Sequence, residues 1–387
     1  MRRALPLSFA ATLLAVAAAV PAAASARSDH RRPHDSRIVG HIYVNDNTAP
    51  ANTVAAFDRH ADGTLTPVPG SPFATGGAGT GATVGSQGAL QETADGRYLL
   101  AVNPASSEVS VLRIERDGAL AAMPGGVVSS GGSEPVSIAL HRHLVYVANA
   151  GAGGSNYTGF VLWRGHLWPI PGSAYALPDS AQPGDVLFNG SGTNLVGTRV
   201  GTSEIDSFAV GRDGRLSAAA GSPFAAQGPG PFGSEFRPTD PSQLFVSNAH
   251  GGAGNGTVSA FHVAADGTLG SIGASPFADS QTAPCWVEIS HDGRFLFTVN
   301  TGTPSISRYA IAPDGSLRLL GSTPFRQGAG LAPFDARLSP DGRTLWVVDN
   351  GGDAVSGFAV DGGRLTELPS SPAGLPAGAK PFGIVVN

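Results

Sequence analysis

One phrase recurs seven times along this chain and constrains its fold more than any other feature. It is a short apolar segment that ends in Asn in five repeats, in Arg in one and in Asp in one. The seven end points are Asn45, Asn103, Asn149, Arg199, Asn248, Asn300 and Asp349. A period of about 50 residues that contains only short strands is typical of a β-propeller blade. The sequence therefore predicts seven blades.

Each repeat divides into four strands. The first strand follows a proline in most repeats, and the second strand ends at the recurrent Asn. An Asp-Gly pair such as Asp117-Gly118 separates the third strand from the fourth, and it indicates a hairpin because both residues tolerate positive φ. We expect the fourth strand to run out into a loop that carries Ser-Pro-Phe, as at Ser71 and Ser222. The predicted fold is all-β: a seven-bladed propeller of four-stranded antiparallel blades.

The two ends of the repeat region complement each other. The region opens with a second strand at 41–45, and it closes with Pro381–Asn387, which has the pattern of a first strand. We therefore expect Ile384–Val386 to pair with Ile42–Val44, so that the N- and C-terminal strands close the ring. Such closure removes two exposed sheet edges.

The N-terminus has the pattern of an export signal. Arg2 and Arg3 precede an apolar run at 4–20, and Ala24-Ser25-Ala26 supplies small residues at a cleavage site. The sequence predicts a signal peptide at 1–26, a flexible linker at 27–37 and the propeller at 38–387. The protein is expected to be secreted and extracellular, without a membrane span, since no run of 18 apolar residues follows.

Net charge and cysteine content limit the binding partners and the disulfides that this protein can have. The formal net charge is −5, which argues against a nucleic-acid partner because such proteins normally present a basic face. The single cysteine, Cys285, excludes an intramolecular disulfide. We expect a monomer that recognises a small molecule.

The first strand of each blade lies nearest the central channel, and its alternate side chains should face that channel. The residues that lie two and four positions after the opening proline carry most of the charge in these strands. We call them the second and fourth positions. This register places five charged residues on consecutive blades: Asp185, Glu235, Glu288, Asp335 and Arg337. Only 14% of the chain is charged, so five charged residues on consecutive inner strands form an unusual concentration of charge.

Such a cluster supports catalysis. Carboxylates held together in a narrow channel acquire raised pKa values, as a general acid or base requires. An arginine beside them could stabilise an oxyanion. We therefore assign catalytic roles to Arg199, Glu235, Glu288, Asp335 and Arg337. In the alternative interpretation, the charges pair with each other and only specify blade order. No cofactor is expected, although calcium could bind the channel oxygens.

Other residues are candidates for ligand binding. Hairpins alternate ends, so the connections between second and third strands share one face of the ring with the connections between blades; we call this the top face. The ligand-binding candidates are Asp185, His250, Trp286, Asn300 and Asp349. Trp286 would present an aromatic wall. In the alternative interpretation of the strand-end Asn residues, they cap their own loops. Cys285 is expected to be a buried, inert thiol, since no base is placed beside it.

Arg199 departs from the repeat because it replaces the usual Asn. A guanidinium at the top rim could present paired donors to an anionic ligand in the channel mouth. Alternatively, Arg199 could bond Asp185 or Glu235 and lock adjacent blades.

Several segments resemble a known family. They are GSQGAL, PVSIAL, YVANAG, GPFGSEF, APCWVEIS, TVNTGTPSISRY and PFDARLSPDGR, which lie between Gly85 and Arg343. Together they resemble the seven-bladed lactonase-like propeller family. That family includes 6-phosphogluconolactonases and carboxymuconate cyclases beside many secreted proteins.

The resemblance implies lactone hydrolysis or lactonisation of a small lactone or anionic ligand in the channel. The alternative is a non-catalytic extracellular propeller that binds a ligand or protein on its top-face loops, since a fold does not determine a function.

Overall fold

The computed structural model describes residues 35–387 with the exception of residue 329. These residues form one compact unit. The predicted signal peptide, and the predicted linker as far as His34, lie outside the described residues. Among the described residues, no helix has the length and hydropathy that a membrane crossing needs.

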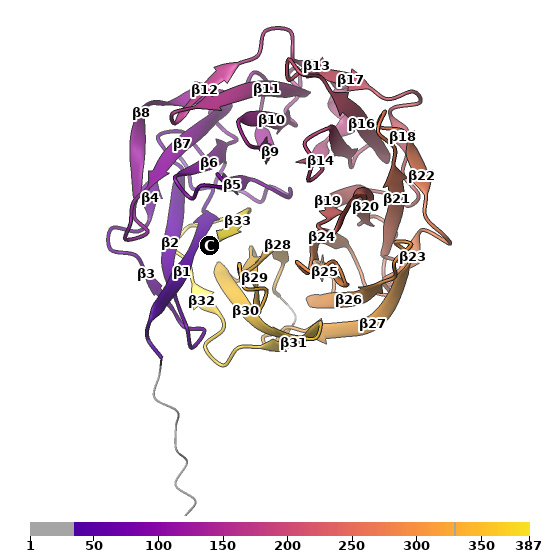
Figure 1. Cartoon of the computed structure of the whole chain (residues 1–387). Helices are drawn as coiled ribbons and strands as arrows, with labels where there is room; N and C mark the ends of the chain where they lie inside the picture. Colours follow the sequence, from indigo (N-terminus) through magenta and orange to yellow (C-terminus); the bar gives the residue numbers. More distant parts are fainter. Residues whose placement is uncertain (1–34, 329) are drawn as a thin grey trace, which may run out of the picture. The chain divides into compact units, whose positions relative to one another are not determined.

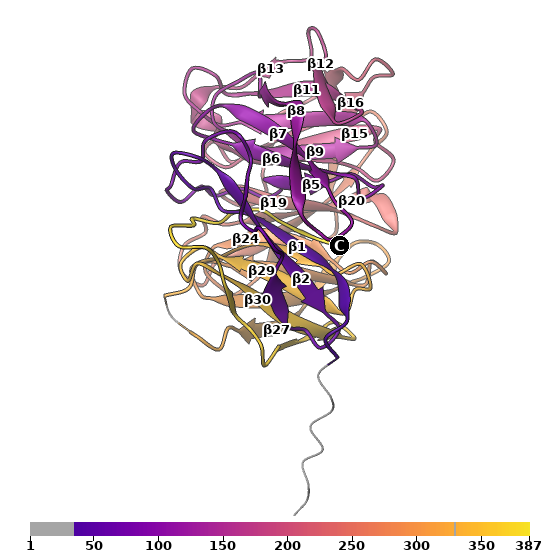
Figure 2. The ribbon, with the colours of Figure 1, turned by 90° about the vertical axis from the view of Figure 1, so that its left-hand side faces the viewer.

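Seven antiparallel sheets are arranged around a central axis as the blades of a propeller (Figure 1). We number the blades 1 to 7 in chain order, and within each blade the first strand is the inner one. Figure 2 shows the same blades from the side.

The strands of blades 1 to 3 have the following bounds. Blade 1 consists of β33 (Ile384–Val386), β1 (Ile38–Asn45), β2 (Thr53–His60), β3 (Leu65–Pro67) and β4 (Phe73–Ala74). Blade 2 consists of β5 (Leu90–Glu92), β6 (Tyr98–Asn103), β7 (Glu108–Ile114) and β8 (Leu120–Ser129). Blade 3 consists of β9 (Pro135–His141), β10 (Leu144–Asn149), β11 (Asn156–Trp163), β12 (His166–Pro169) and β13 (Tyr175–Ala176).

A short 3₁₀ helix, η1 (Asp179–Ala181), leads into the remaining four blades. Blade 4 consists of β14 (Pro183–Phe188), β15 (Asn194–Arg199), β16 (Glu204–Val210), β17 (Leu216–Ala218) and β18 (Phe224–Ala225). Blade 5 consists of β19 (Pro231–Arg237), β20 (Asp240–Asn248), β21 (Thr257–Val263), β22 (Leu269–Ser271) and β23 (Phe277–Ala278). Blade 6 consists of β24 (Pro284–Ile289), β25 (Phe295–Asn300), β26 (Ser305–Ile311) and β27 (Leu317–Pro324). Blade 7 consists of β28 (Pro333–Leu338), β29 (Thr344–Asp349), β30 (Ala354–Asp361), β31 (Arg364–Glu367) and β32 (Ala373–Gly374).

The predicted fold class is confirmed, and so is the closure of the ring. Each of the seven repeat end points is the last residue of a second strand. Strand β33 pairs with β1 in the expected register, with Val44 opposite Ile384 and Ile42 opposite Val386. The Asn387 side chain extends this closure because its Oδ1 accepts the His41 backbone N–H at 2.8 Å.

The Ser-Pro-Phe segments do not lie in loops after the fourth strand, as the sequence had indicated. They divide that strand into two short pieces, and the phenylalanine begins the second piece, as Phe73 does in β4. The serine hydroxyl fills the gap between the pieces: Ser71 Oγ accepts the Ala56 N–H at 2.9 Å. The same bond recurs from Ser207 to Ser222, from Ala260 to Ser275 and from Gly357 to Ser371. The serine thereby satisfies a backbone donor that the interrupted ladder leaves open.

A segment before β5 crosses the central axis at the top face, and we call residues 84–88 the channel plug. Ser86 Oγ donates to the Val136 carbonyl of blade 3 at 2.6 Å, and the Gln87 N–H donates to Gly184 of blade 4 at 2.9 Å. Gln87 Nε2 donates to the Ser234 carbonyl of blade 5 at 2.7 Å. The plug therefore ties several inner strands together at the axis.

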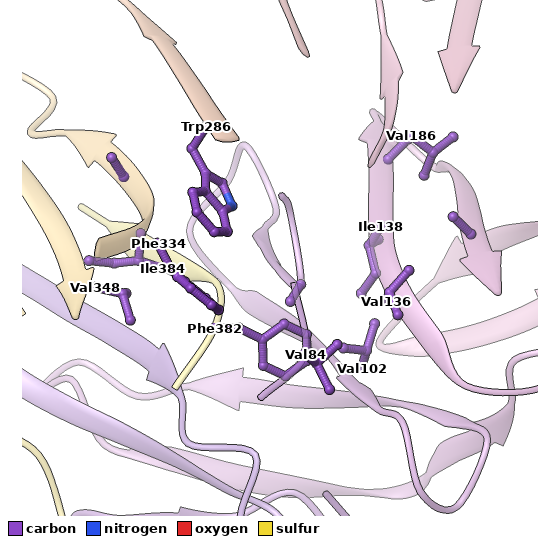
Figure 3. Packing of buried hydrophobic residues seen from close by; sticks show 14 of the residues in the cluster. Val84, Val102, Val136, Ile138, Val186, Trp286, Phe334, Val348, Phe382 and Ile384 are labelled. Atoms are coloured by element: carbon purple, nitrogen blue, oxygen red, sulfur yellow. The ribbon is translucent and has the colours of Figure 1, made fainter. Parts of the chain in front are cut away.

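Apolar side chains fill the axis around the plug. Figure 3 shows Val84, Trp286, Phe334 and Phe382 converging there from different blades. Trp286 stacks on Phe334 with ring centroids 4.5 Å apart, and its Nε1 donates to the Ser86 carbonyl at 2.7 Å. The top end of the channel is therefore closed by packed side chains.

Candidate functional site

The five charged residues of the predicted cluster come together at the axis. Strand β14 carries Asp185, β19 carries Glu235, and β24 carries Glu288. Strand β28 carries both Asp335 and Arg337. The pKa values of Asp185, Glu235 and Asp335 each respond to the charge of Arg337, and Glu288 forms an ion pair with it, so the five residues form one electrostatic cluster. The register read from the sequence along the inner strands is therefore correct.

The two aspartates lie directly beneath the plug, at the second position of their strands. Asp185 is 2% exposed and accepts hydrogen bonds from Ser234 Oγ at 2.6 Å, the Ser234 N–H at 3.0 Å and Ser137 Oγ at 3.2 Å. Burial raises its pKa to about 7, against the effect of these hydrogen bonds. Asp335 accepts the backbone N–H groups of Ala336 at 2.9 Å and Gly88 at 3.2 Å. Both aspartates are thus held in place by neighbours.

Glu288 and Arg337 form an ion pair at the fourth position of their strands. Arg337 Nη1 lies 3.0 Å from Glu288 Oε2, and Glu288 Oε1 accepts the Leu338 N–H at 3.0 Å. Burial opposes the charge of Arg337, but Asp335, Glu288 and Glu235 together hold its pKa above the ordinary value. Within the described part of the chain, the hydrogen bonds of this guanidinium come from Nη1 alone. Nε and Nη2 therefore remain available as donors.

Glu235 has the most exposed position among the four acids. It is half-buried, and no protein group in residues 35–328 and 330–387 hydrogen-bonds its carboxyl. Burial, followed by the charge of Glu288, raises its pKa to about 8, and the charge of Arg337 opposes this shift. A carboxyl with this pKa and without a protein partner is suited to exchange a proton with a bound molecule.

The channel opens toward the face that carries the turns between first and second strands, which we call the bottom face. Residues at the second position, such as Asp185 and Asp335, are buried under the plug. At the fourth position, nearer the bottom face, Glu235, Arg337 and Gln91 are half-exposed. A ligand would therefore reach the cluster from the bottom face, whereas the sequence had placed the rim of the site at the top.

Arg199 does not join the channel cluster, which corrects one prediction. It is 6% exposed, its Nε and Nη2 bind the two carboxylate oxygens of Asp206 at 2.7 and 2.6 Å, and Nη1 lies 3.3 Å from Glu204 Oε2. All three residues belong to blade 4, so Arg199 bonds neither Asp185 nor Glu235 and presents no open fork at the channel mouth.

The repeat itself contains the signal for this pairing. In blades 2, 3 and 6 the strand-end Asn donates to a residue seven positions later, as Asn103 does to Ser110 and Asn300 to Ser307. In blade 4 both members are replaced, by Arg199 and Asp206. The two exchanges compensate each other and keep the cross-strand bond as an ion pair.

Trp286 was expected to form an aromatic wall for a ligand, and this expectation is also wrong. It is 1% exposed beneath the plug and fills the apolar axis. Its neighbour Cys285 is buried, and burial raises the pKa of its thiol to about 11. Cys285 is thus an inert thiol in this environment.

The remaining ligand-binding candidates lie apart from the cluster. His250 is exposed in the loop after β20, where its ring packs against Gly230. Asn300 is fully buried, and its Nδ2 donates to Ser305 and Ser307 of the same blade. Asp349 is also buried and accepts the N–H groups of two residues in neighbouring loops. Asn300 therefore bonds the neighbouring strand β26, and Asp349 holds the loops beside its own strand end.

Residues 35–328 and 330–387 contain no group of three or more His, Cys, Asp or Glu side chains arranged to hold a metal ion. Among the channel carboxyls, those of Asp185, Asp335 and Glu288 are engaged by hydroxyl groups, backbone N–H groups and Arg337.

Sequence reasoning missed the plug and its central residue, Gln87. Gln87 Oε1 accepts the Val287 N–H at 3.0 Å, while its Nε2 binds the Ser234 carbonyl. A Cβ at Gly233 would collide with Gln87 Oε1, which explains the glycine at the second position of β19. The available signal was that blade 2 has Gln87 where most blades have a proline.

Comparison with known proteins supports the fold and the family. Residues 193–381 match the family described as "Lactonase, 7-bladed beta-propeller". A search of curated proteins found no significant match.

Many solved structures share the fold. A protein of Bacteroides uniformis described as a "putative 6-phosphogluconolactonase" has a TM-score of 0.73 at 18% identity, over 90% of this chain and 99% of that one. The periplasmic gluconolactonase PpgL of Pseudomonas aeruginosa has a TM-score of 0.71 at 19% identity, over 89% and 98% of the two chains. At these identities the likeness extends to the fold alone.

Proposed function

Residues 193–381 belong to the seven-bladed lactonase family, and from this premise we propose that the protein hydrolyses a small lactone in its central channel. The observation that carries the proposal is the Glu235 carboxyl, which has a pKa near 8 and no protein hydrogen bond among the described residues. It lies in one electrostatic cluster with Arg337, whose Nε and Nη2 are open.

The residues of the cluster can share the steps of lactone hydrolysis. Ionised Glu235 removes a proton from a water molecule, and the water oxygen attacks the lactone carbonyl. The open donors of Arg337 stabilise the negative charge that develops on the carbonyl oxygen. When the ring C–O bond breaks, the proton held by Glu235 passes to the departing ring oxygen. The product is a hydroxy acid that releases its carboxyl proton to solvent, and the resulting carboxylate faces Arg337.

The other acids orient these two groups. Glu288 holds Arg337 through Nη1 and is itself fixed by the Leu338 N–H. Asp335 lies between Arg337 and the plug, and its charge raises the pKa of Arg337. We regard Glu288, Asp335 and Asp185 as positioning residues. Secretion remains a prediction from the N-terminal sequence and would place the reaction outside the cell.

The test is hydrolysis of a panel of aldonolactones, followed through the acid released. Glu235→Gln should lower kcat/KM by a factor of about 100 or more, the usual effect of removing a general base. Arg337→Lys should lower kcat because it removes the planar fork. Glu108→Gln on β7, outside the channel, is the matched control and should retain activity.

Two results would refute the proposal. One is full activity of the folded Glu235→Gln protein, since the carboxyl would then have no part in the reaction. The other is failure of the unaltered protein to hydrolyse any lactone of the panel. That second result would favour the alternative, a non-catalytic binding propeller.

A further inference from the structure

A cavity lies away from the axis, on the bottom face between blades 2 and 3. It has a volume of about 720 Å³ and is bordered by the β5–β6 turn, the β9–β10 turn and the β11–β12 turn. Three arginines contribute to its wall: Arg97, Arg142 and Arg164. We call this cavity the arginine pocket. It shares no residue with the channel cluster.

The turn at Arg164 departs from its counterpart in blade 7. Both turns join the third strand to the fourth through two residues, which are Arg164-Gly165 in blade 3 and Gly362-Gly363 in blade 7. Arg164 has φ 51° and Gly362 has φ 52°, a left-handed conformation that costs a residue with a side chain about 1 kcal/mol. Arg142, in the β9–β10 turn, has φ 54°. Blade 3 thus carries arginine at two positions where the backbone disfavours a side chain, and such strain collects at functional sites.

Aromatic rings fix the planes of two of these guanidinium groups. Arg97 lies over the Tyr98 ring at 5.6 Å, and Arg164 lies over the Trp163 ring at 5.5 Å. His143 contacts the edge of Trp163 with the ring centroids 6.2 Å apart. Stacking orients a guanidinium while its N–H edges stay available for bidentate contacts.

The arginine pocket is positive in a protein that is negative overall. Within the described residues, the side chains of Arg97, Arg142 and Arg164 form no hydrogen bond or ion pair with another residue. The one acid in the wall, Asp95, is engaged within its own turn, where its Oδ1 accepts Thr93 Oγ1 at 2.7 Å. The chain as a whole has a formal net charge of −5. Three open cations at one pocket therefore favour a ligand with more than one negative group.

We propose that the arginine pocket binds an acidic oligosaccharide, a short chain of uronic acid rings. The volume lies in the range of sites that bind small ligands. Trp163, which is 55% exposed, offers an apolar surface to the C–H face of a ring. The arginines lie on two blades and bind carboxylates on successive rings.

The probe for this proposal is trigalacturonate, titrated into the full protein at low salt by calorimetry and by tryptophan fluorescence. We expect saturable binding and a change in tryptophan emission, whereas the neutral trisaccharide maltotriose should not bind. Arg164→Gly should weaken binding at least tenfold. It should not unfold the protein, because blade 7 carries glycine at the same turn position. Arg318→Ala, which removes an exposed arginine from β27 in blade 6, is the control for net charge and should bind like the unaltered protein.

Several outcomes would overturn the proposal. They are the lack of trigalacturonate binding at millimolar concentration, unchanged affinity in Arg164→Gly, or equal weakening in Arg318→Ala. Equal affinity for a hexaglutamate peptide would show that charge alone is recognised. Equal affinity for monomeric galacturonate would show that a single ring accounts for the binding, so that an oligosaccharide is not the ligand. Glu235→Gln should bind trigalacturonate normally, so this test is independent of lactone hydrolysis.

Discussion

Replacement of Glu235 by glutamine should make the protein more stable in alkaline solution. The Glu235 carboxyl has a pKa near 8 in the folded protein, against an ordinary value of 4.5, because burial and the charge of Glu288 disfavour its ionised form. The folded protein therefore binds this proton more tightly than the unfolded chain does. The resulting contribution to stability is complete below pH 4.5 and is lost as the pH rises through about 8. Glutamine is neutral throughout and avoids this loss.

The magnitude follows from the two pKa values. A change from 4.5 to about 8 corresponds to roughly 5 kcal/mol, at about 1.36 kcal/mol for each tenfold change in proton affinity. Because Glu235 is half-exposed to channel water, solvent screens part of this energy, and we expect the variant to gain about 2 kcal/mol at pH 9. At pH 4 the two proteins should have similar stability.

Urea unfolding at several pH values between 4 and 9 measures this difference. Glu108→Gln provides the control for removal of one carboxyl outside the channel. If Glu235→Gln were less stable than the unaltered protein at pH 9, the ionised carboxyl would have to be stabilised by its surroundings, and the reasoning about the channel would fail. The lactone hydrolysis that we propose should become faster as the pH rises through the same range, since only ionised Glu235 can activate water.

Three further predictions concern the plug, the thiol and the closure of the ring. Gln87→Ala should lower the free energy of unfolding by about 2–4 kcal/mol, because it leaves the Val287 N–H and the Ser234 carbonyl without partners; an unchanged urea midpoint would contradict this. Cys285 should not react with a thiol reagent at pH 8 in the folded protein but should react in urea, since burial raises its pKa to about 11; rapid reaction without urea would refute this placement. Deletion of Ile384–Asn387 removes the inner strand of blade 1 and should abolish cooperative thermal unfolding, whereas a sharp unchanged transition would show that the closure is dispensable.

The strands of the site could be predicted, but only some of its chemistry. The alternation of side chains along the inner strands placed Asp185, Glu235, Glu288, Asp335 and Arg337 at the axis without any knowledge of distances. The same pattern could not tell which carboxyl is held by neighbours and which is free. That distinction depends on partners from other blades, such as Ser234 for Asp185, and such contacts are far apart in the sequence.

The sequence by itself determined the number of blades, the register of the inner strands and the closure of the ring. The sequence pattern behind these features repeats with a period of about 50 residues, and each repeat shows the same local preference for strands and turns. Only the tertiary structure decided that residues 84–88 cross the axis, that Trp286 is buried beneath them and that the channel opens at the bottom face. The crossing segment occurs once, so no period reveals it. Its hydrogen bonds join residues as much as 247 positions apart, and they form only when the closed ring brings their blades together.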